Sequence, residues 1–60
     1  MIIRLQVFTD GEWGTLNTRQ STSNEDDVAK VMTELSLMQS AWASNYGRFA
    51  DATFRIVKEK

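Results

Sequence analysis

The 60-residue chain contains no cysteine and no histidine. Without cysteine it can form neither a disulfide nor a thiolate metal site. Without histidine it lacks the commonest general base and the commonest transition-metal ligand of proteins. A domain of this size buries only about 60% of the surface that its unfolded chain exposes. Packing or self-association must therefore supply the stability that disulfides and metals give to other small domains.

The chain also lacks an excess of charge of either sign and any long apolar run. Seven basic and eight acidic residues give a net charge of −1, whereas dedicated nucleic-acid-binding proteins usually carry a clear excess of Lys and Arg. No apolar run approaches the roughly 20 residues that span a bilayer. The start, Met1 to Arg4, has no basic leader and no small-residue cleavage site. We therefore expect a soluble cytoplasmic protein with no signal peptide and no membrane partner.

Acidic and hydroxyl side chains that could take part in catalysis or bind a metal are present, but they do not form a recognisable site. Three consecutive acids at 25–27 fall where a helix is expected to begin, and the positive end of the helix dipole favours carboxylates there. The calcium-loop pattern of acids at alternate positions followed by a distal Glu is absent. The hydroxyl run 21–23 has no histidine to activate it. The sequence predicts a protein that is not an enzyme and has no catalytic residues, no cofactor and no metal.

The longest pattern is an amphipathic helix from Ser23 to about Asn45. Apolar residues recur at steps of three and four, which places them on one face of a helix. They are Val28, Val31, Leu35, Met38 and Trp42, with Met32 widening the stripe. Ser23 followed by Asp26 has capping-box spacing, and Thr22 or Asn24 is the alternative cap. Gly47 is expected to end the helix in a left-handed conformation.

A β-hairpin is predicted from strands at 2–9 and 12–19. They flank Asp10-Gly11, a dipeptide that tolerates positive φ at both centres of a type I′ turn. This register predicts four pairs, which are Thr9–Glu12, Phe8–Trp13, Leu5–Leu16 and Arg4–Asn17. A longer loop over residues 11–14 is the alternative. Because Gly14 has no side chain, Trp42 of the helix is a candidate for close approach to the backbone there.

A third strand is predicted at 52–58, after a connector at 48–51 and before a frayed tail at 58–60. The first strand is the most apolar, so we place it in the centre and obtain the strand order 2-1-3. All pairs are then antiparallel, and the right-handed preference for crossovers determines which face the helix covers. The prediction is one α+β domain over residues 1–60 with ββαβ topology, in which one long helix packs on one face of a three-stranded sheet.

The sheet face away from the helix is the predicted functional surface. Its candidate partner-binding residues are Arg4, Phe8, Trp13, Arg19 and Arg55. The expected face contains no Lys and no acid, and Trp, Phe and Arg are enriched at protein interfaces. Another protein, or a second copy in a homodimer, is therefore the expected partner. Two alternatives remain: the aromatic pair only shields the hairpin, or the arginines and aromatics bind nucleic acid.

The opening "IIRLQVFTDGEW", the helix with acids in its first turn and the closing "FRIVKEK" resemble short phage- or prophage-encoded proteins of unassigned function. The resemblance is to a strand-strand-helix-strand pattern, and its sharpest parts are Trp13 and residues 54–57. It implies a modulator or inhibitor of a host protein, acting in the host cytoplasm. It carries over no functional residues, because no site motif is shared.

Overall fold

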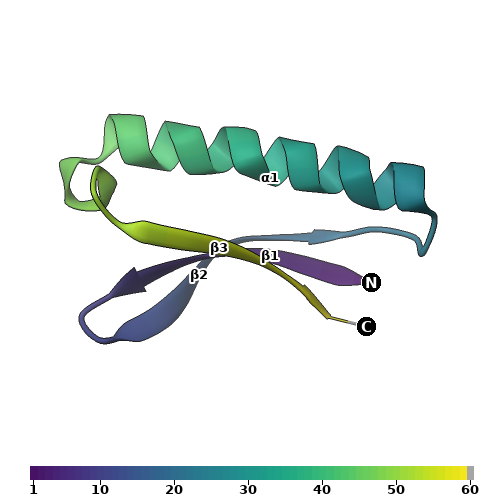
Figure 1. Ribbon diagram of the computed structural model, residues 1–60, viewed down its shortest axis with the longest axis horizontal. Helices are drawn as coiled ribbons and strands as arrows, with labels where there is room; N and C mark the ends of the chain where they lie inside the picture. The colour runs from purple at the N-terminus through teal and green to yellow at the C-terminus, as the bar shows by residue number, and fades with distance from the viewer. Residues whose placement is uncertain (60) are drawn as a thin grey trace.

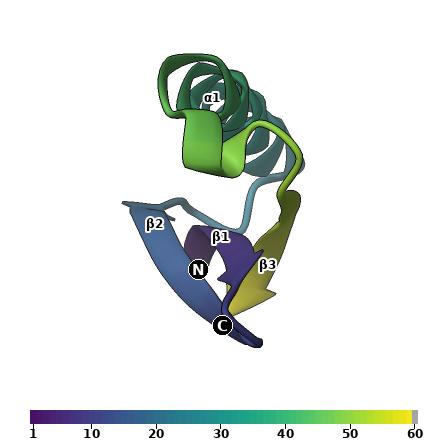
Figure 2. The same cartoon turned by 90° about the vertical axis from the view of Figure 1, so that its left-hand side faces the viewer.

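The computed structural model describes residues 1–59, which form a three-stranded antiparallel sheet covered on one face by a long helix (Figure 1). The elements in chain order are β1 (Ile2–Thr9), β2 (Glu12–Gln20), α1 (Glu25–Asn45), the 3-10 helix η1 (Gly47–Phe49) and β3 (Thr53–Glu59). The strand order is β2-β1-β3. The predicted ββαβ topology, strand order and α+β class are confirmed. We call the sheet face toward α1 the inner face and the opposite face the outer face (Figure 2).

The turn between β1 and β2 has the predicted geometry. Asp10 and Gly11 adopt φ angles of 53° and 83°, and positive φ at both central residues is the mark of a type I′ turn. Thr9 pairs with Glu12 and Phe8 pairs with Trp13, as predicted. The alternative longer loop over residues 11–14 is wrong.

A β-bulge in β2 changes the register farther from the turn. Gln6 pairs with Thr15 but Leu5 pairs with Asn17, so Leu16 is an extra residue in β2. The predicted pairs Leu5–Leu16 and Arg4–Asn17 are therefore wrong. Because successive side chains alternate between the faces of a sheet, one inserted residue exchanges the faces of every residue beyond it.

The core lies between α1 and the inner face. Alternate residues of β1, namely Ile3, Leu5 and Val7, are almost completely buried. Leu35 of α1 is 0% exposed, and Val31 is buried beside it. The rest of the predicted helical stripe is partly buried against this core, together with Leu16, Phe54 and Ile56. The amphipathic pattern of α1 and the alternation of β1 thus correctly predicted the core residues that these two elements supply.

Helix α1 ends at Asn45 as predicted, but the residues that cap its two ends differ from the predictions. Asn24, the alternative, is the N-cap: its side-chain oxygen accepts hydrogen bonds from the N–H groups of Asp26 and Asp27 at 2.8 and 3.4 Å. The first-choice cap, Ser23, is wrong. Gly47 has no positive φ among the described residues and instead begins η1, because the chain continues into another tight turn rather than leaving the helix through a left-handed residue.

Strand β3 begins and ends one residue later than predicted. Lys58 pairs with Ile3 and Glu59 with Ile2, so the tail expected to be frayed is part of the sheet as far as Glu59. Lys60, the last residue of that predicted tail, lies outside the described residues. Within residues 1–59, no helix combines the length and apolar character needed to cross a membrane.

Candidate partner-binding surface

The outer face carries a cluster of five side chains that crosses all three strands, which we call the outer cluster. Its members are Gln6, Phe8, Trp13, Thr15 and Arg55. The rings of Phe8 and Trp13 meet edge to face, with centroids 5.2 Å apart. The Arg55 guanidinium lies over the Trp13 ring, 4.0 Å from its centroid.

Hydrogen bonds to the Gln6 side chain link side chains of all three strands within this cluster. The Arg55 Nε–H donates to Gln6 Oε1 at 2.8 Å, and Gln6 Nε2 donates to Thr15 Oγ1 at 3.1 Å. The register explains this geometry, because Gln6 on the central strand is directly opposite both Thr15 and Arg55. Side chains directly opposite one another lie on the same face and within contact distance. Three of the five predicted partner-binding residues, Phe8, Trp13 and Arg55, are thereby brought together.

Arg4 is also on the outer face, but its charge is balanced there. Its guanidinium forms an ion pair with Glu59. The expectation that the outer face contains no acid is therefore wrong. It rested on a third strand that ended at residue 58, whereas β3 includes Glu59 opposite Ile2. Arg4 contributes a paired charge to the surface rather than a free cation.

Arg19 was placed on the outer face, and this placement is wrong. Because it lies beyond the bulge, its side chain points toward α1, where its Nε donates to Glu34 Oε1 at 3.0 Å. Its Nη2 lies 3.7 Å from the sulfur of Met38. Thr18, which pairs with Arg4, takes the outer position instead. Arg19 therefore joins β2 to the helix and is separated from the outer cluster by the sheet.

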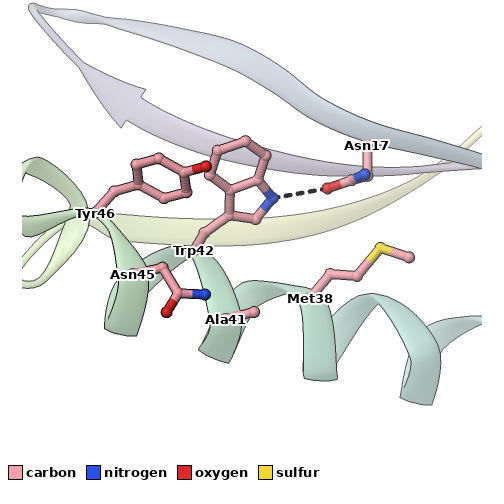
Figure 3. Close-up of a pocket in the computed structure, with 6 residues that line it drawn as sticks. All are labelled: Asn17, Met38, Ala41, Trp42, Asn45 and Tyr46. Carbon is pink, nitrogen blue, oxygen red and sulfur yellow. Dashed lines mark hydrogen bonds between the residues drawn. The ribbon is translucent and has the colours of Figure 1, made fainter.

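The predicted pair with Arg4 would have put Asn17 on the outer face, but the bulge pairs it with Leu5 and places it on the inner face. The indole Nε1–H of Trp42 donates to its Oδ1 at 2.8 Å (Figure 3). The predicted close approach of Trp42 to Gly14 is wrong: apart from Gly14 and its two chain neighbours, no described residue has an atom within 4 Å of the position a Gly14 Cβ would take. Nothing in the alternation of β2 marks the bulge, so sequence reasoning had no signal for this bond.

A small open pocket lies beside this hydrogen bond, between β2 and the C-terminal half of α1. It is lined by Asn17, Met38, Ala41, Trp42, Asn45 and Tyr46 and has a volume of about 210 Å³. Figure 3 shows Tyr46 on one side of the Trp42 indole and Met38 on the other. The centroids of the Trp42 and Tyr46 rings are 5.0 Å apart. No catalytic or ligand motif pointed to this pocket.

Aromatic side chains close the end of the core next to the pocket. Phe49 of η1 is 6% exposed and was assigned only to a connector in the sequence. Its ring meets Trp42 edge to face at 5.8 Å and Phe54 at 6.4 Å. A three-residue 3-10 helix has too little periodicity to reveal a buried face, so the sequence did not identify this core residue.

The carboxylate of Asp27, at the start of α1, has a pKa that its surroundings lower. Asp27 Oδ2 accepts hydrogen bonds from the N–H and hydroxyl of Thr22, at 2.7 and 3.0 Å. These bonds hold the pKa of Asp27 below its ordinary value, Lys30 acts in the same direction, and partial desolvation opposes them. Acids do not gather in groups of three or more that could hold a metal ion anywhere in residues 1–59. Asp27 thus fastens the loop after β2 to the helix.

The chain matches no protein-family model, no curated protein and no solved structure.

Proposed function

We propose that this domain is a protein-binding module that acts through the outer cluster. The supporting observation is the contact among Phe8, Trp13 and Arg55 on a sheet face that no other element of residues 1–59 covers (Figure 2). Phe8 keeps 43% of its surface exposed. The residues that contribute most binding energy at protein interfaces are enriched in Trp and Arg and cluster together.

The outer cluster is held in place before any partner arrives. Arg55 is fixed by its bond to Gln6 and by the ring of Trp13, so little side-chain freedom remains to be lost on binding. Immobilising a flexible side chain at an interface costs about 0.5–1.5 kcal/mol. From the resemblance to short phage-encoded proteins, the proposed partner is a host protein whose activity the domain modulates or inhibits. A second copy of the chain is the other protein partner to test.

The nucleic-acid alternative has less support than the arginine count of the sequence suggested. Arg19 lies on the inner face and Arg4 is paired with Glu59, which leaves Arg55 as the predicted arginine without an acidic partner among the described ion pairs. Affinity for nucleic acid depends on the number of phosphates that basic side chains neutralise. One such arginine on a chain of net charge −1 gives little of that affinity.

The test is capture of binding proteins from host lysate by the immobilised domain, with identification by mass spectrometry. The double variant Phe8→Ser, Trp13→Ser removes both rings of the outer cluster. We expect the captured protein to be lost with this variant, whereas circular dichroism still shows a folded helix. Sedimentation of the purified wild type and double variant tests self-association through the same face.

The matched control is Leu37→Ser. Leu37 lies on α1 and is 69% exposed, so this variant also removes a solvent-exposed apolar side chain, but far from the outer cluster. Capture that survives the double variant, or that Leu37→Ser abolishes equally, contradicts the proposal. Binding of duplex or single-stranded DNA whose log affinity falls linearly with log salt would instead favour the nucleic-acid alternative.

A further inference from the structure

Strand β2 is an edge of the sheet, and its free backbone groups can be identified. Met1 and Ser21 exchange two backbone hydrogen bonds, at 2.9 and 3.0 Å. Hydrogen-bonded and non-hydrogen-bonded pairs alternate along an antiparallel ladder. Ile3–Arg19 is therefore hydrogen-bonded and Arg4–Thr18 is not. The N–H and C=O groups of Thr18 and of Gln20 consequently point away from β1, toward the open edge.

A side chain of the same strand covers part of this edge. The Arg19 Nη1 donates to the carbonyl oxygen of Thr18 at 2.9 Å in an exposed position. The same guanidinium remains bound to Glu34 through Nε. Freeing the Thr18 carbonyl oxygen for another donor therefore breaks one solvent-exposed hydrogen bond and leaves the Arg19–Glu34 ion pair in place. The edge is covered by a group that an incoming strand can replace.

The pocket between β2 and α1 lies next to this edge. None of its six lining side chains is charged. The Trp42 and Tyr46 rings, the Met38 thioether and the Ala41 methyl make its apolar walls, and the amides of Asn17 and Asn45 complete the lining. An apolar cavity of about 150 Å³ accommodates benzene, so the pocket volume of about 210 Å³ suits one aromatic side chain. Residues directly opposite each other on neighbouring strands lie on the same face. The residue of an added strand opposite Asn17 would therefore enter the pocket.

We propose that β2 binds an extended segment of a partner protein as a fourth, antiparallel strand, with one aromatic side chain of that segment in the pocket. Backbone hydrogen bonds at Thr18 and Gln20 give affinity, and the pocket gives specificity, as in other recognition by strand addition. This site is separate from the outer cluster, because it lies at the edge of the sheet and on its inner face.

Charge selects β2 over β3 and indicates the chemistry of the segment. β2 carries Glu12 at its start and Arg19, which points toward α1 and is paired with Glu34, and residues 13–18 between them are uncharged. β3 carries Arg55, Lys58 and Glu59, and charged side chains discourage strand addition at an edge. The turn at the start of β2 carries the acids Asp10 and Glu12. The C-terminal end of an antiparallel segment reaches this turn, so a Lys or Arg there is complementary to it.

A foreign segment suits this site better than β2 of a second copy. Gly14, Asn17 and Arg19 of β2 face inward but are small or polar. Leu16, its apolar inward residue, already packs against the core of its own chain. Pairing of β2 with β2 would thus leave the pocket without an aromatic occupant.

The test begins with selection of binders from a displayed library of random peptides against the wild-type domain. We expect selected peptides to share one aromatic residue flanked by β-branched residues and a basic residue toward the C-terminus. The best peptide is then synthesised, and its dissociation constant is measured by calorimetry. Methylation of the peptide amide that faces β2 should weaken binding about tenfold or more, whereas methylation of the adjacent amide should not.

Two helix variants locate the bound peptide. Ala41→Glu places a carboxylate at the pocket and should weaken binding about tenfold or more, because burying a charge without a partner is unfavourable. Ser40→Glu adds the same charge to an adjacent exposed position of α1 that turns away from the pocket and should leave binding unchanged. Circular dichroism confirms that both variants are folded.

Three results would overturn this proposal. They are a selection without enrichment, a peptide that tolerates both Ala41→Glu and amide methylation, and a wild-type domain whose sedimentation shows a dimer that Ala41→Glu dissociates. The Phe8→Ser, Trp13→Ser variant should bind the peptide normally. The two proposals can therefore fail independently of each other.

Discussion

The inner and outer faces of the sheet are built on the same three strands, yet their side chains interact in different ways. The inner face is held by apolar contacts with α1, and Ile3, Leu5 and Leu35 are all 0% exposed. The outer face is held by hydrogen bonds and ring contacts among exposed and half-buried side chains, such as Arg55 with Gln6 and Trp13. Burial of apolar area is the larger favourable term in folding. The inner face therefore supplies stability, and the outer face can vary without loss of the fold.

The largest expected effect tests burial directly with two leucines of the same helix. Leu35→Ala should reduce the free energy of unfolding by about 2–5 kcal/mol, because it removes a fully buried side chain and leaves a cavity. Typical per-residue values give a chain of this length roughly 3–9 kcal/mol in total, so much of this variant should be unfolded. Leu37→Ala, at a position 69% exposed, should change the free energy of unfolding by less than about 0.5 kcal/mol. Urea denaturation followed by circular dichroism measures both, and similar losses would contradict the comparison.

Hydrogen bonds on the two faces of β2 provide the next test. Asn17→Ala leaves the Trp42 indole N–H without its partly buried acceptor and should cost about 1–3 kcal/mol. Thr15→Ala removes the exposed bond to Gln6 on the outer face and should cost less than about 0.5 kcal/mol. The indole N–H resonance of Trp42 should shift only in the first variant. Equal costs would show that the faces do not differ in this respect.

The contact of Arg55 with Trp13 should contribute less still. An exposed cation–π contact contributes about 0.5–1 kcal/mol, so Arg55→Ala should lower the free energy of unfolding by about that amount. The ring of Trp13 should shift the side-chain protons of Arg55 upfield in the wild type, and nuclear magnetic resonance detects this shift. Its absence would show that Arg55 is mobile in solution and that the outer cluster is not held in advance.

The smallest effect concerns Asp27, whose bonds to Thr22 lie at an exposed edge of the molecule. Because its folded pKa is depressed below the unfolded value of about 3.9, its bonded carboxylate stabilises the fold above that pH. This contribution is lost as the pH falls through the folded pKa. Asp27→Asn should therefore flatten the fall of unfolding free energy on the acid side, as urea denaturation at several pH values would show. Asp26→Asn, at the same helix end but without the Thr22 bonds, should not reproduce the change.

Local patterns were sufficient to predict most of the fold. Asp10-Gly11 determines the turn and the pairs nearest to it, and the helical stripe determines which side of α1 is buried. The capping-box spacing favoured Ser23 wrongly over Asn24, because the neighbouring residues Thr22, Ser23 and Asn24 can all accept the same hydrogen bonds. In the structure the N–H and hydroxyl of Thr22 donate to Asp27, and Asn24 is the residue that caps the helix.

The part of the candidate site on β2 was predicted correctly as far as the bulge and wrongly beyond it. Phe8 and Trp13 lie between the turn and Leu16, so the turn register placed them correctly. Arg19 lies beyond Leu16. Because the prediction assumed strict alternation of faces along β2 and did not include the extra residue, it assigned Arg19 to the wrong face. A bulge depends on how β2 twists to follow β1 and α1, and the residue types of β2 do not record this.

The extra residue at Leu16 has a practical consequence for mutagenesis of this protein. A combinatorial library that randomises every second position of β2 from Trp13 onward samples the solvent-facing surface only as far as Thr15. From Asn17 onward the same odd positions are Asn17 and Arg19, whose side chains face α1, so randomising them removes the bonds to Trp42 and Glu34 instead of varying the outer face. A productive library has to switch from odd to even positions at this point and continue through Thr18 and Gln20.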